Sequence, residues 1–340
     1  MELKGKRIMV TGGAGFIGSH FVDQLLLRDP QSVFIVDDMS NGRMQCIPVD
    51  ARVSFTRMDL RHEAWDTADV DVVVQLASAV TGIAHNNRCK LQMLQDNLRI
   101  YTNVVEQLRL NKPELYIYVS TACVYPHYAP VPTPERWGNV CDPEPTNWGY
   151  GVAKWVGEAQ AKLVCSELDV PTMIVRFFNA IGPRDHYEKW ISHVTPALIR
   201  RVWELDRTHA YPNPEELIIW GSGNQKRVFV DARDIARILL DLAEIDEAHD
   251  AIPINIGHSR MISINELAEM VINAVVCDPA SYNIVPDMNK PEGYPLRAAD
   301  TTRLEGLIGT GYEWIPLAKS ITDMVLDYKR QRNSKWIRDL

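Results

Sequence analysis

The sequence lacks any segment that would cross a membrane or direct export. No run approaches the roughly 18 apolar residues that a transmembrane helix requires. The N-terminus leads straight into a strand-like segment, without the apolar region and small-residue cleavage site of a signal peptide. We therefore expect a cytoplasmic protein that does not interact with a membrane.

Cysteine is scarce, and basic residues are outnumbered. In a chain of this size, cysteines that are far apart and form no CxxC pair are typical of reduced thiols, not of a disulfide framework or a metal site. The formal net charge of −8 argues against a nucleic-acid partner, which requires a basic face. A local basic pocket for a phosphorylated ligand is still compatible with it. The six cysteines are Cys46, Cys89, Cys123, Cys141, Cys165 and Cys277.

What the sequence does contain is an alternation of apolar strand-like segments with segments of helical periodicity. Strands that are apolar throughout indicate a parallel sheet with helices on both faces, so we predict an α/β fold with a doubly wound parallel sheet. The expected strands are 7–11, 32–38, 53–60, 71–78, 115–121 and one that begins in 171–183; the expected helices run from the glycine-rich turn to about Leu27, and over 91–110, 150–168 and 231–245.

The pattern loosens after about Asn179, where Pro and Gly punctuate 182–223 and 278–295. We expect a dinucleotide-binding domain of residues 1–179 plus about 228–262. A smaller substrate-binding lobe would comprise about 180–227 plus 263–335. The substrate is expected between the two parts, at the carboxyl ends of the sheet strands.

A glycine-rich turn, TGGAGFIG, joins the first strand to the first helix. Gly12, Gly15 and Gly18 permit a tight turn and close backbone approach, so a pyrophosphate can lie at the helix N-terminus, which begins with Phe16 and Ile17. Such a turn alone is a weak signal, because it also occurs as a purely structural feature.

The acidic end of the second strand strengthens the interpretation. Asp37 follows Gly18 by 19 residues, where a carboxylate accepts hydrogen bonds from ribose hydroxyls and repels the 2′-phosphate of NADP. This favours NAD as the cofactor, although a solvated loop would also explain Asp37 and Asp38. Asp59, at the end of the third strand, is an expected neighbour of the adenine, and Leu76 and Ala77 complete the expected cofactor contacts.

Tyr150 and Lys154 are four residues apart and so lie on one face of a helix. The ordinary tyrosine pKa of about 10 is too high for a base at neutral pH, but a nearby ammonium and a cationic nicotinamide would stabilise the phenolate. The pair alone would also fit a helix surface. Its position after a strand that ends at Thr121 adds a hydroxyl at the carboxyl edge of the sheet, which favours a catalytic site.

With these motifs, the chain resembles the extended short-chain dehydrogenases that act on nucleotide sugars, from Arg7 to about Leu304. The resemblance implies NAD(P)-dependent hydride transfer and a homodimer. Thr121 would be the catalytic hydroxyl, Tyr150 the base and Lys154 its support. For substrate binding, it implies contacts from Asn179 beside cofactor and sugar, from Trp220 and Arg227 at the nucleotide diphosphate, and from Arg297 in a C-terminal loop.

Three segments narrow the resemblance to the branch of that family that contains GDP-mannose 3,5-epimerase and GDP-fucose synthase. In that branch a cysteine two residues after the catalytic hydroxyl is an acid/base, with a Lys or His partner in the smaller lobe. Cys123 matches the first position, and His193, in Ser-His-Val, is the candidate partner. The segments are Thr121-Ala-Cys123-Val-Tyr125-Pro126, the stretch 81–87 that includes Gly82, and Glu144-Pro145-Thr146-Asn147.

The chemistry of an epimerase fits this pair. Oxidation of carbon 4 to a ketone acidifies the hydrogens on carbons 3 and 5, and inversion then requires a base on one face and an acid on the other. Cysteine and histidine have pKa values close enough to neutrality for both tasks. A buried apolar role for Cys123 and a helix-terminal role for His193 are the alternatives. A 4,6-dehydratase is disfavoured, because Ala and Cys follow Thr121 instead of an acidic pair.

The sequence therefore predicts an NAD-dependent nucleotide-sugar epimerase. The specific expectation is a GDP-sugar 3,5-epimerase, with GDP-mannose as a substrate to test, acting through transient oxidation at carbon 4. One alternative is a GDP-4-keto-6-deoxy-sugar epimerase/reductase that consumes reduced cofactor. Another is a carbon-4 epimerase in which Cys123 and His193 take no part. The third is an inactive NAD-binding regulatory protein, against which the intact Thr121, Tyr150 and Lys154 count.

Overall fold

The computed structural model describes residues 1–65, 69–80, 86, 88–189, 191–208, 214–258, 260–290 and 292–333 of the 340-residue chain. Within these ranges no helix has both the length and the apolar character needed to span a bilayer.

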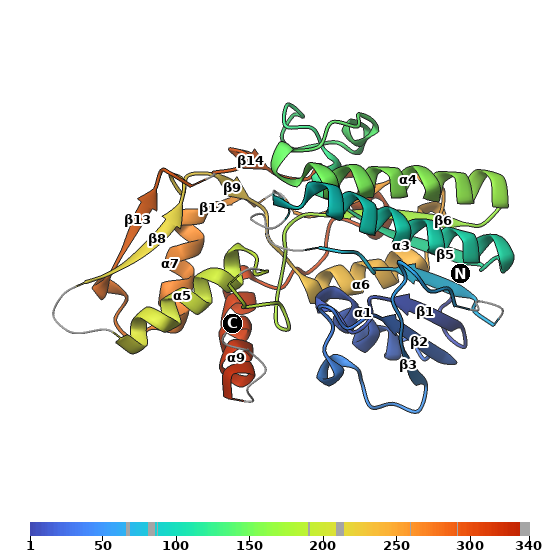
Figure 1. Ribbon diagram of the computed structural model, residues 1–340, viewed down its shortest axis with the longest axis horizontal. Helices are drawn as coiled ribbons and strands as arrows, with labels where there is room; N and C mark the ends of the chain where they lie inside the picture. Colours follow the sequence, from blue (N-terminus) through green and yellow to red (C-terminus); the bar gives the residue numbers. More distant parts are fainter. Residues whose placement is uncertain are drawn as a thin grey trace.

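A seven-stranded sheet forms the larger part of the molecule (Figure 1). Its strand order is β11-β6-β5-β4-β1-β2-β3, and every neighbouring pair is parallel. The order reverses direction at β1 and β4, so the carboxyl ends of those strands flank a crevice suited to ligand binding. The strands are β1 (Arg7–Thr11), β2 (Ser32–Asp37), β3 (Val53–Arg57), β4 (Val72–Gln75), β5 (Leu115–Thr121), β6 (Thr172–Phe177) and β11 (Ile254–Ile256).

Alternate side chains of the strands pack on opposite faces of the sheet, and both faces are covered. Ile8 and Val10 of β1 belong to a core with α1 (Phe16–Leu26) and α6 (Ala232–Ala243). Met9 faces the other way, into a core with α3 (Lys90–Leu110) and α4 (Trp148–Leu168). Burial on both faces explains why the strands are apolar throughout. The predicted α/β fold with a doubly wound parallel sheet is confirmed.

The smaller part of the molecule has its own core, which includes Leu198, Leu267 and Met324. It is formed by α5 (Val194–Thr208), α7 (Ile264–Val275) and α9 (Leu317–Asn333), beside the parallel pair β8 (Glu215–Trp220) and β13 (Tyr282–Asp287), at the left of Figure 1. The remaining elements are β7 (Ala180–Ile181), β9 (Lys226–Arg227), β10 (Val230–Asp231), β12 (Ile262–Ser263), β14 (Leu296–Arg297), α8 (Thr302–Ile308), η1 (Met44–Cys46), η2 (Ala122–Val124), η3 (Glu135–Asn139), η4 (Pro145–Asn147), η5 (Asp246–Ala248) and η6 (Pro279–Ser281).

The strand expected to begin in 171–183 is β6, and β7 follows it after Asn179, whose φ of 27° is incompatible with a continuous strand. Another element differs from the sequence-based expectation. Late in the chain, Leu304 of α8 packs into the core of the large sheet. The two-part division at about residues 180, 228 and 263 stays a prediction.

The chain returns to the large sheet just before α8. The backbone N–H of Thr133 donates to Ala298 O at 2.9 Å, and the N–H of Asp300 donates to Thr133 O at 3.1 Å. Asn255 Nδ2 of β11 donates to the same Thr133 oxygen at 2.9 Å. Residues around 298–300 thus fix the segment that follows β5.

Candidate active site

The glycine-rich turn lies against the end of β4. Gly12 has a φ of +73°, and a Cβ there would lie 2.8 Å from the backbone nitrogen of Ala77. A Cβ on Gly18 would lie 2.1 Å from Gly12 O, and Gly15 immediately precedes Phe16, the first residue of α1. The first backbone N–H groups of a helix have no partner within it, so this narrow cradle fits a pyrophosphate.

Leu76 and Ala77 border the same turn. The N–H of Leu76 donates to Thr11 O at 3.1 Å, and the N–H of Ala77 donates to Thr11 Oγ1 at 3.2 Å. The structure therefore brings these two residues and Gly12 together, as the predicted cofactor contacts require.

Asp37 ends β2 beside the glycine turn and is 7% exposed. Its carboxylate accepts hydrogen bonds from the N–H of Ala14 at 3.0 Å and of Met39 at 2.9 Å. Burial raises the pKa of Asp37, and these two donors oppose the rise. Each oxygen keeps a further lone pair, so the carboxylate can still accept a ribose hydroxyl.

Asp59 is engaged by a neighbouring arginine. Arg61 donates to the Asp59 carboxylate from Nε and Nη2, both at 2.8 Å. Hydrogen bonding to Arg61 lowers the pKa of Asp59 and keeps it ionised. The role of Asp59 beside an adenine stays a prediction.

The hydroxyls of Thr121, Tyr150 and Ser78 meet at the carboxyl edge of the sheet. Thr121 is the last residue of β5, and Tyr150 lies in the first turn of α4. Tyr150 as a whole is half-buried, and its hydroxyl is within hydrogen-bonding reach of Ser78 and of Thr121. Thr121 Oγ1 also accepts from the N–H of Cys123 at 3.3 Å.

Lys154 lies one helical turn after Tyr150 and is almost fully buried, with Nζ donating to Val119 O at 2.8 Å. Its Nζ is 5.9 Å from the ring centroid of Tyr150. Burial lowers the pKa of Lys154 to about 7, against the opposing charges of Glu158 and Cys123. Burial likewise raises the pKa of Tyr150 well above its ordinary value. In these surroundings alone Tyr150 is a neutral phenol, so the expected fall of its pKa depends on further positive charge.

Cys123 lies in the same cluster and is contacted by Arg297. Arg297 Nη1 points at Cys123 Sγ from 3.9 Å, while its Nη2 donates to Glu144 Oε2 at 3.2 Å. The guanidinium carbon lies 4.6 Å from the ring centroid of Tyr294. Arg297, expected only as a substrate ligand, therefore lies against the predicted acid/base.

Arg227 lies beside Arg297 because β9 and β14 are parallel neighbours in which these two residues are paired. Burial, reinforced by the like charge of Arg297, lowers the pKa of Arg227 to about 10. Two half-buried guanidinium groups side by side repel each other, and an anion with several oxygens relieves that repulsion. The pair fits the predicted diphosphate site.

The other expected substrate residues lie in separate places. Trp220 ends β8 and is 44% exposed, with Lys290 Nζ 5.6 Å from its ring centroid. Asn179 lies between β6 and β7, and its Nδ2 donates to Val228 O at 2.7 Å. Gly82 lies outside the described residues.

His193 immediately precedes α5 and pairs with an acidic residue. Its Nδ1 is 3.5 Å from Asp185 Oδ1, and its carbonyl accepts from the N–H of Ala197 at 3.0 Å. Among the described interactions, none joins His193 to Cys123. The structure therefore brings Cys123 to Thr121, Tyr150 and Lys154, but does not bring His193 into contact with it.

Three residues at the site, Ser78, Glu144 and Tyr294, and the His193 partner Asp185 were missed by the sequence interpretation. Ser78 follows the already selected Leu76 and Ala77, so its position at a strand end was a usable signal. Glu144 lies inside the quoted Glu144–Asn147 segment, but its ion pair with Arg297 spans 153 positions. No local pattern reveals such a pair.

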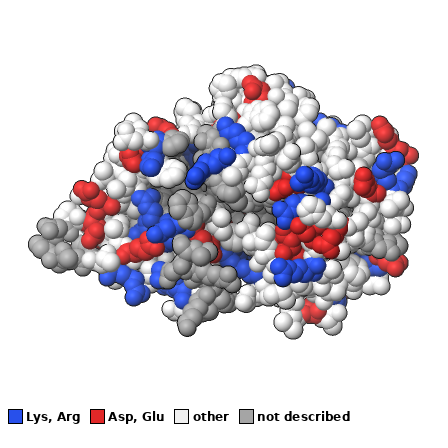
Figure 2. All heavy atoms as spheres, viewed as in Figure 1, with Lys and Arg blue, Asp and Glu red and all other residues white. Residues whose placement is uncertain are grey.

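The described surface of the molecule bears no large region of one charge on the face shown in Figure 2, where acidic and basic side chains are mixed. The paired arginines Arg227 and Arg297 are therefore a local basic feature of the site.

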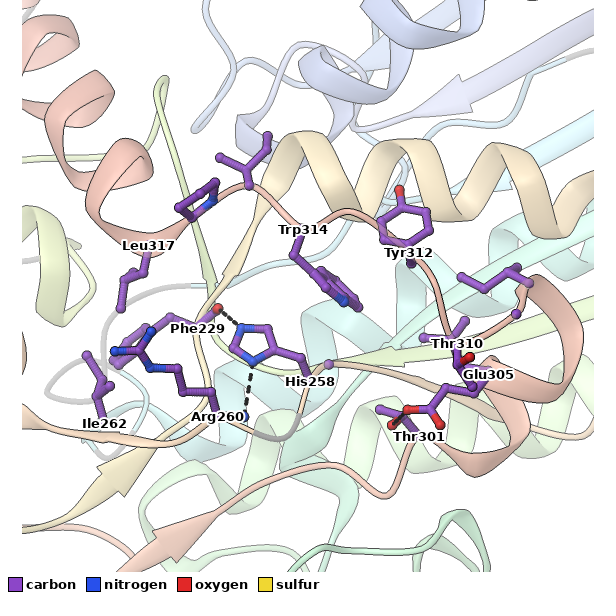
Figure 3. A pocket seen from close by; sticks show the side chains of 16 residues that line it. Phe229, His258, Arg260, Ile262, Thr301, Glu305, Thr310, Tyr312, Trp314 and Leu317 are labelled. Atoms are coloured by element: carbon purple, nitrogen blue, oxygen red, sulfur yellow. Dashed lines mark hydrogen bonds between the residues drawn. The ribbon is translucent and has the colours of Figure 1, made fainter.

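A pocket of about 420 Å³ is lined by none of the predicted site residues. In Figure 3, His258 and Trp314 lie between Arg260 and Ile262 on one side and Thr301 and Glu305 on the other. A hollow of about 20 Å³ is lined in part by Tyr294 and Arg297.

Comparison with known proteins gives one family match and many relatives. Residues 8–257 match the model described as the NAD dependent epimerase/dehydratase family. GDP-L-fucose synthase 1 of Arabidopsis thaliana is 30% identical over 90% of this chain and 88% of its own length. The GDP-L-fucose synthase of Escherichia coli K12 is 28% identical over 89% and 90%.

Solved structures share the fold over nearly the whole chain. A UDP-N-acetylglucosamine 4-epimerase of Methanobrevibacter ruminantium, in complex with UDP-N-acetylmuramic acid, superposes with a TM-score of 0.80, at 24% identity over 96% of this chain and 99% of that one. The UDP-glucose 4-epimerase of Thermotoga maritima, with UDP-glucose, gives a TM-score of 0.79 at 23% identity with the same coverage.

Proposed function

Because the chain belongs to the NAD-dependent epimerase/dehydratase family and is thus an enzyme of nucleotide-sugar metabolism, we propose that it is a GDP-sugar 3,5-epimerase. It would act through transient oxidation at carbon 4. The observation that carries the proposal is the position of Cys123: its thiol shares one cluster with Tyr150 and Lys154 and lies 3.9 Å from Arg297.

The cofactor cradle supports NAD. Gly12, Gly15 and Gly18 would hold the pyrophosphate, Asp37 the ribose, and Leu76 and Ala77 the wall beside the turn. The near contacts at Gly12 and Gly18 leave no room for larger side chains, which is the fit that a closely approaching phosphate demands. When bound, NAD supplies the acceptor and donor of the hydride at carbon 4.

The remaining steps of the proposed reaction are carried out by side chains of this protein. Tyr150 takes the proton of the sugar hydroxyl at carbon 4, Thr121 holds the same oxygen, and Lys154 supports the phenolate. The ketone at carbon 4 then acidifies the neighbouring ring hydrogens. Cys123 and His193 exchange protons at carbons 3 and 5 from the two faces of the ring. Arg227 and Arg297 bind the diphosphate, and Trp220 and Asn179 contact the nucleotide and the sugar.

The names of the relatives favour a second candidate. Several relatives with 25–30% identity are GDP-L-fucose synthases, which supports a GDP-4-keto-6-deoxy-sugar epimerase/reductase. Such an enzyme consumes one reduced cofactor per product, whereas the proposed epimerase consumes none. The two candidates share the Cys123 and His193 chemistry, so cofactor balance distinguishes them.

We also propose a cytoplasmic homodimer as the working form. Large apolar side chains on α3 and α4 are exposed, namely Leu91, Leu110, Trp148 and Leu163, and a partner subunit would cover them. The free thiols of all six cysteines are compatible with a reducing compartment.

The deciding experiment is incubation with GDP-mannose and other nucleotide sugars in deuterated water, followed by NMR of the product. The proposed epimerase incorporates deuterium at carbons 3 and 5 without net oxidation of NADH or NADPH. Cys123→Ser and His193→Asn each lose incorporation at one or both carbons, yet still oxidise carbon 4, because Thr121, Tyr150 and Lys154 remain.

Tyr150→Phe is the matched control, since it removes only the hydroxyl of the oxidation step and should slow all incorporation by about 10²-fold or more. Wild-type incorporation in both the Cys123 and His193 variants would rule out the 3,5-type mechanism. A product inverted only at carbon 4 would identify a carbon-4 epimerase instead.

A further inference from the structure

The segment before α5 buries an acidic residue, Asp185, that the known motifs do not assign. Asp185 has no exposed surface, and Thr195 in the first turn of α5 is equally buried. Asp185 Oδ2, Glu188 Oε2 and Thr195 Oγ1 have no hydrogen-bond partner among the described residues. Buried carboxylates are costly unless a cation or several donors compensate them, so the partner of Asp185 is of interest.

The one ion pair of Asp185 within the described residues is with His193. Asp185 Oδ1 accepts from the N–H of His186 at 2.7 Å and lies 3.5 Å from Nδ1 of His193. Arg43 approaches, but its Nη2 donates to the backbone oxygen of Asp185 at 3.1 Å and not to the carboxylate. The imidazole of His193 is therefore the counter-ion of the buried Asp185 carboxylate.

The other charged groups around this segment have partners of their own. Arg184 pairs with Asp23 of α1 at 2.7 Å. His186 Nδ1 accepts a hydrogen bond from Arg43 Nη2 at 3.0 Å and lies 3.7 Å from Glu188 Oε2, beyond hydrogen-bond distance. Arg200 of α5 pairs with Glu204 at 3.0 Å. From α9, Asp327 accepts from the N–H of Arg184 at 2.7 Å and from the hydroxyl of Tyr187 at 3.3 Å. These interactions leave Asp185 and His193 to each other.

We propose that Asp185 is the positioning residue of His193: its buried carboxylate holds Nδ1 of the ring, so that Nε2 carries the proton exchanged with the sugar. The proposal rests on the proposed function, in which His193 is the second proton carrier. A carboxylate on one ring nitrogen fixes the tautomer and orientation of an imidazole and stabilises its charged form. The side chain is 47% exposed, so a ligand can reach the ring.

The electrostatics agree with this geometry. Desolvation lowers the pKa of His193, but the charge of Asp185 and the hydrogen bond to it outweigh that effect, and the net shift is upward. A raised pKa keeps the ring protonated to higher pH than an ordinary histidine.

The first test is an NMR titration of the histidine ring protons in the full-length protein without substrate. The His193 signal is identified by its loss in His193→Asn. We expect it to titrate above pH 6.5 in the wild type, and Asp185→Asn to lower its pKa by about one unit or more, which corresponds to tenfold in proton affinity. Glu188→Gln, a neighbouring carboxylate variant, should leave the His193 titration unchanged.

A wild-type His193 that titrates at or below pH 6.5 would overturn the proposal without any variant. So would an unchanged titration in a folded Asp185→Asn protein.

The second test is the pH dependence of deuterium incorporation into the nucleotide sugar. In Asp185→Asn the alkaline limb of the profile should move to lower pH with the NMR titration, while Glu188→Gln keeps the wild-type profile. An NMR shift with a fixed incorporation profile overturns the positioning role and leaves a structural ion pair. A wild-type protein that incorporates no deuterium from any nucleotide sugar, but shows the NMR shift, instead contradicts the proposed function.

Discussion

At the scale of single residues, Lys154 occupies a proposed catalytic position in a buried environment that disfavours its charged form. The folded protein holds its pKa at about 7, against 10.5 for an unperturbed lysine, because burial disfavours the ammonium. Between these two values the unfolded chain binds more protons than the folded one, so this group adds stability as pH rises. Below pH 7 both states are protonated, and the folded state bears the full cost of the buried charge.

Lys154→Met should therefore be inactive but more stable than the wild type at low pH. The gain is expected to be about 2–3 kcal/mol larger at pH 6 than at pH 9. Urea unfolding of both proteins at the two pH values measures it. Lys162→Met, on the same helix but partly exposed, is the control and should show no such pH dependence. An equal stability difference at pH 6 and pH 9 would contradict the buried-charge explanation.

The sequence predicted which residues form the catalytic cluster better than it predicted their partners. The four-residue spacing of Tyr150 and Lys154 follows from helix geometry, and the observed α4 has both in its first turns. The bond from Lys154 to Val119, 35 positions earlier, does not follow from it. The contact of Arg297 with Cys123 likewise depends on strand pairing between distant segments, which local patterns do not encode.

At the scale of elements, the junction of β1, β4 and α1 depends on glycine for two separate reasons. Gly12 has a left-handed backbone conformation, and its Cα faces the backbone of Ala77. Gly12→Ala should thus be destabilised by strain and should also push β4 away from the turn. We expect at least a tenfold loss of NAD affinity, measured by titration, together with a lowered melting temperature.

Gly5 provides the matched control for that substitution. Its φ of +71° is close to that of Gly12, but no atom lies within 4 Å of a Cβ added there. Gly5→Ala should show only the backbone strain of about 1–2 kcal/mol and keep wild-type NAD affinity. If the two variants lose NAD affinity equally, close approach at Gly12 is not what the turn requires.

Element boundaries show where sequence patterns stop being informative. The strands β1, β2 and β5 and the long helices α3 and α4 were predicted within two residues at each end, whereas the expected strand 71–78 is β4, which ends at Gln75. The segment 53–60 was predicted as one strand, yet β3 ends at Arg57, where the chain turns so that Asp59 can meet Arg61. The strand expected to begin in 171–183 is β6, but the apolar pattern did not show that it ends at Phe177. The break after β3 accompanies local hydrogen bonds between Asp59 and Arg61, and the break after β6 accompanies the positive φ of Asn179 and its long-range hydrogen bond to Val228.

At the scale of the whole molecule, cofactor choice should be measurable as stability. A ligand that binds only the folded state stabilises it by about 2.7 kcal/mol at 100 times its Kd. Because Asp37 would meet the 2′-phosphate of NADP, a penalty on the order of 1–3 kcal/mol is expected for that cofactor. NAD should therefore raise the melting temperature clearly more than NADP at equal concentration.

Asp37→Ala tests the cause of that preference. Removal of the carboxylate should narrow the difference between the two cofactors, because NAD loses its ribose acceptor and the 2′-phosphate of NADP is no longer repelled. Equal or larger stabilisation of the wild type by NADP would contradict the assignment of Asp37 and would favour the reductase over the epimerase.

The late return of the chain to the sheet also has a consequence for its synthesis. In chain order, the last strand of the seven-stranded sheet is β11, which ends at Ile256. Arg297 follows 41 residues later. The next residues, Ala298 and Asp300, hold the segment after β5 through backbone hydrogen bonds to Thr133. At about 5–20 residues per second, a ribosome needs roughly 2–8 seconds to add that stretch. During this interval a nascent chain already carries all seven strands and the glycine turn, while Arg297, whose guanidinium lies beside the Cys123 thiol in the folded protein, has not yet been added.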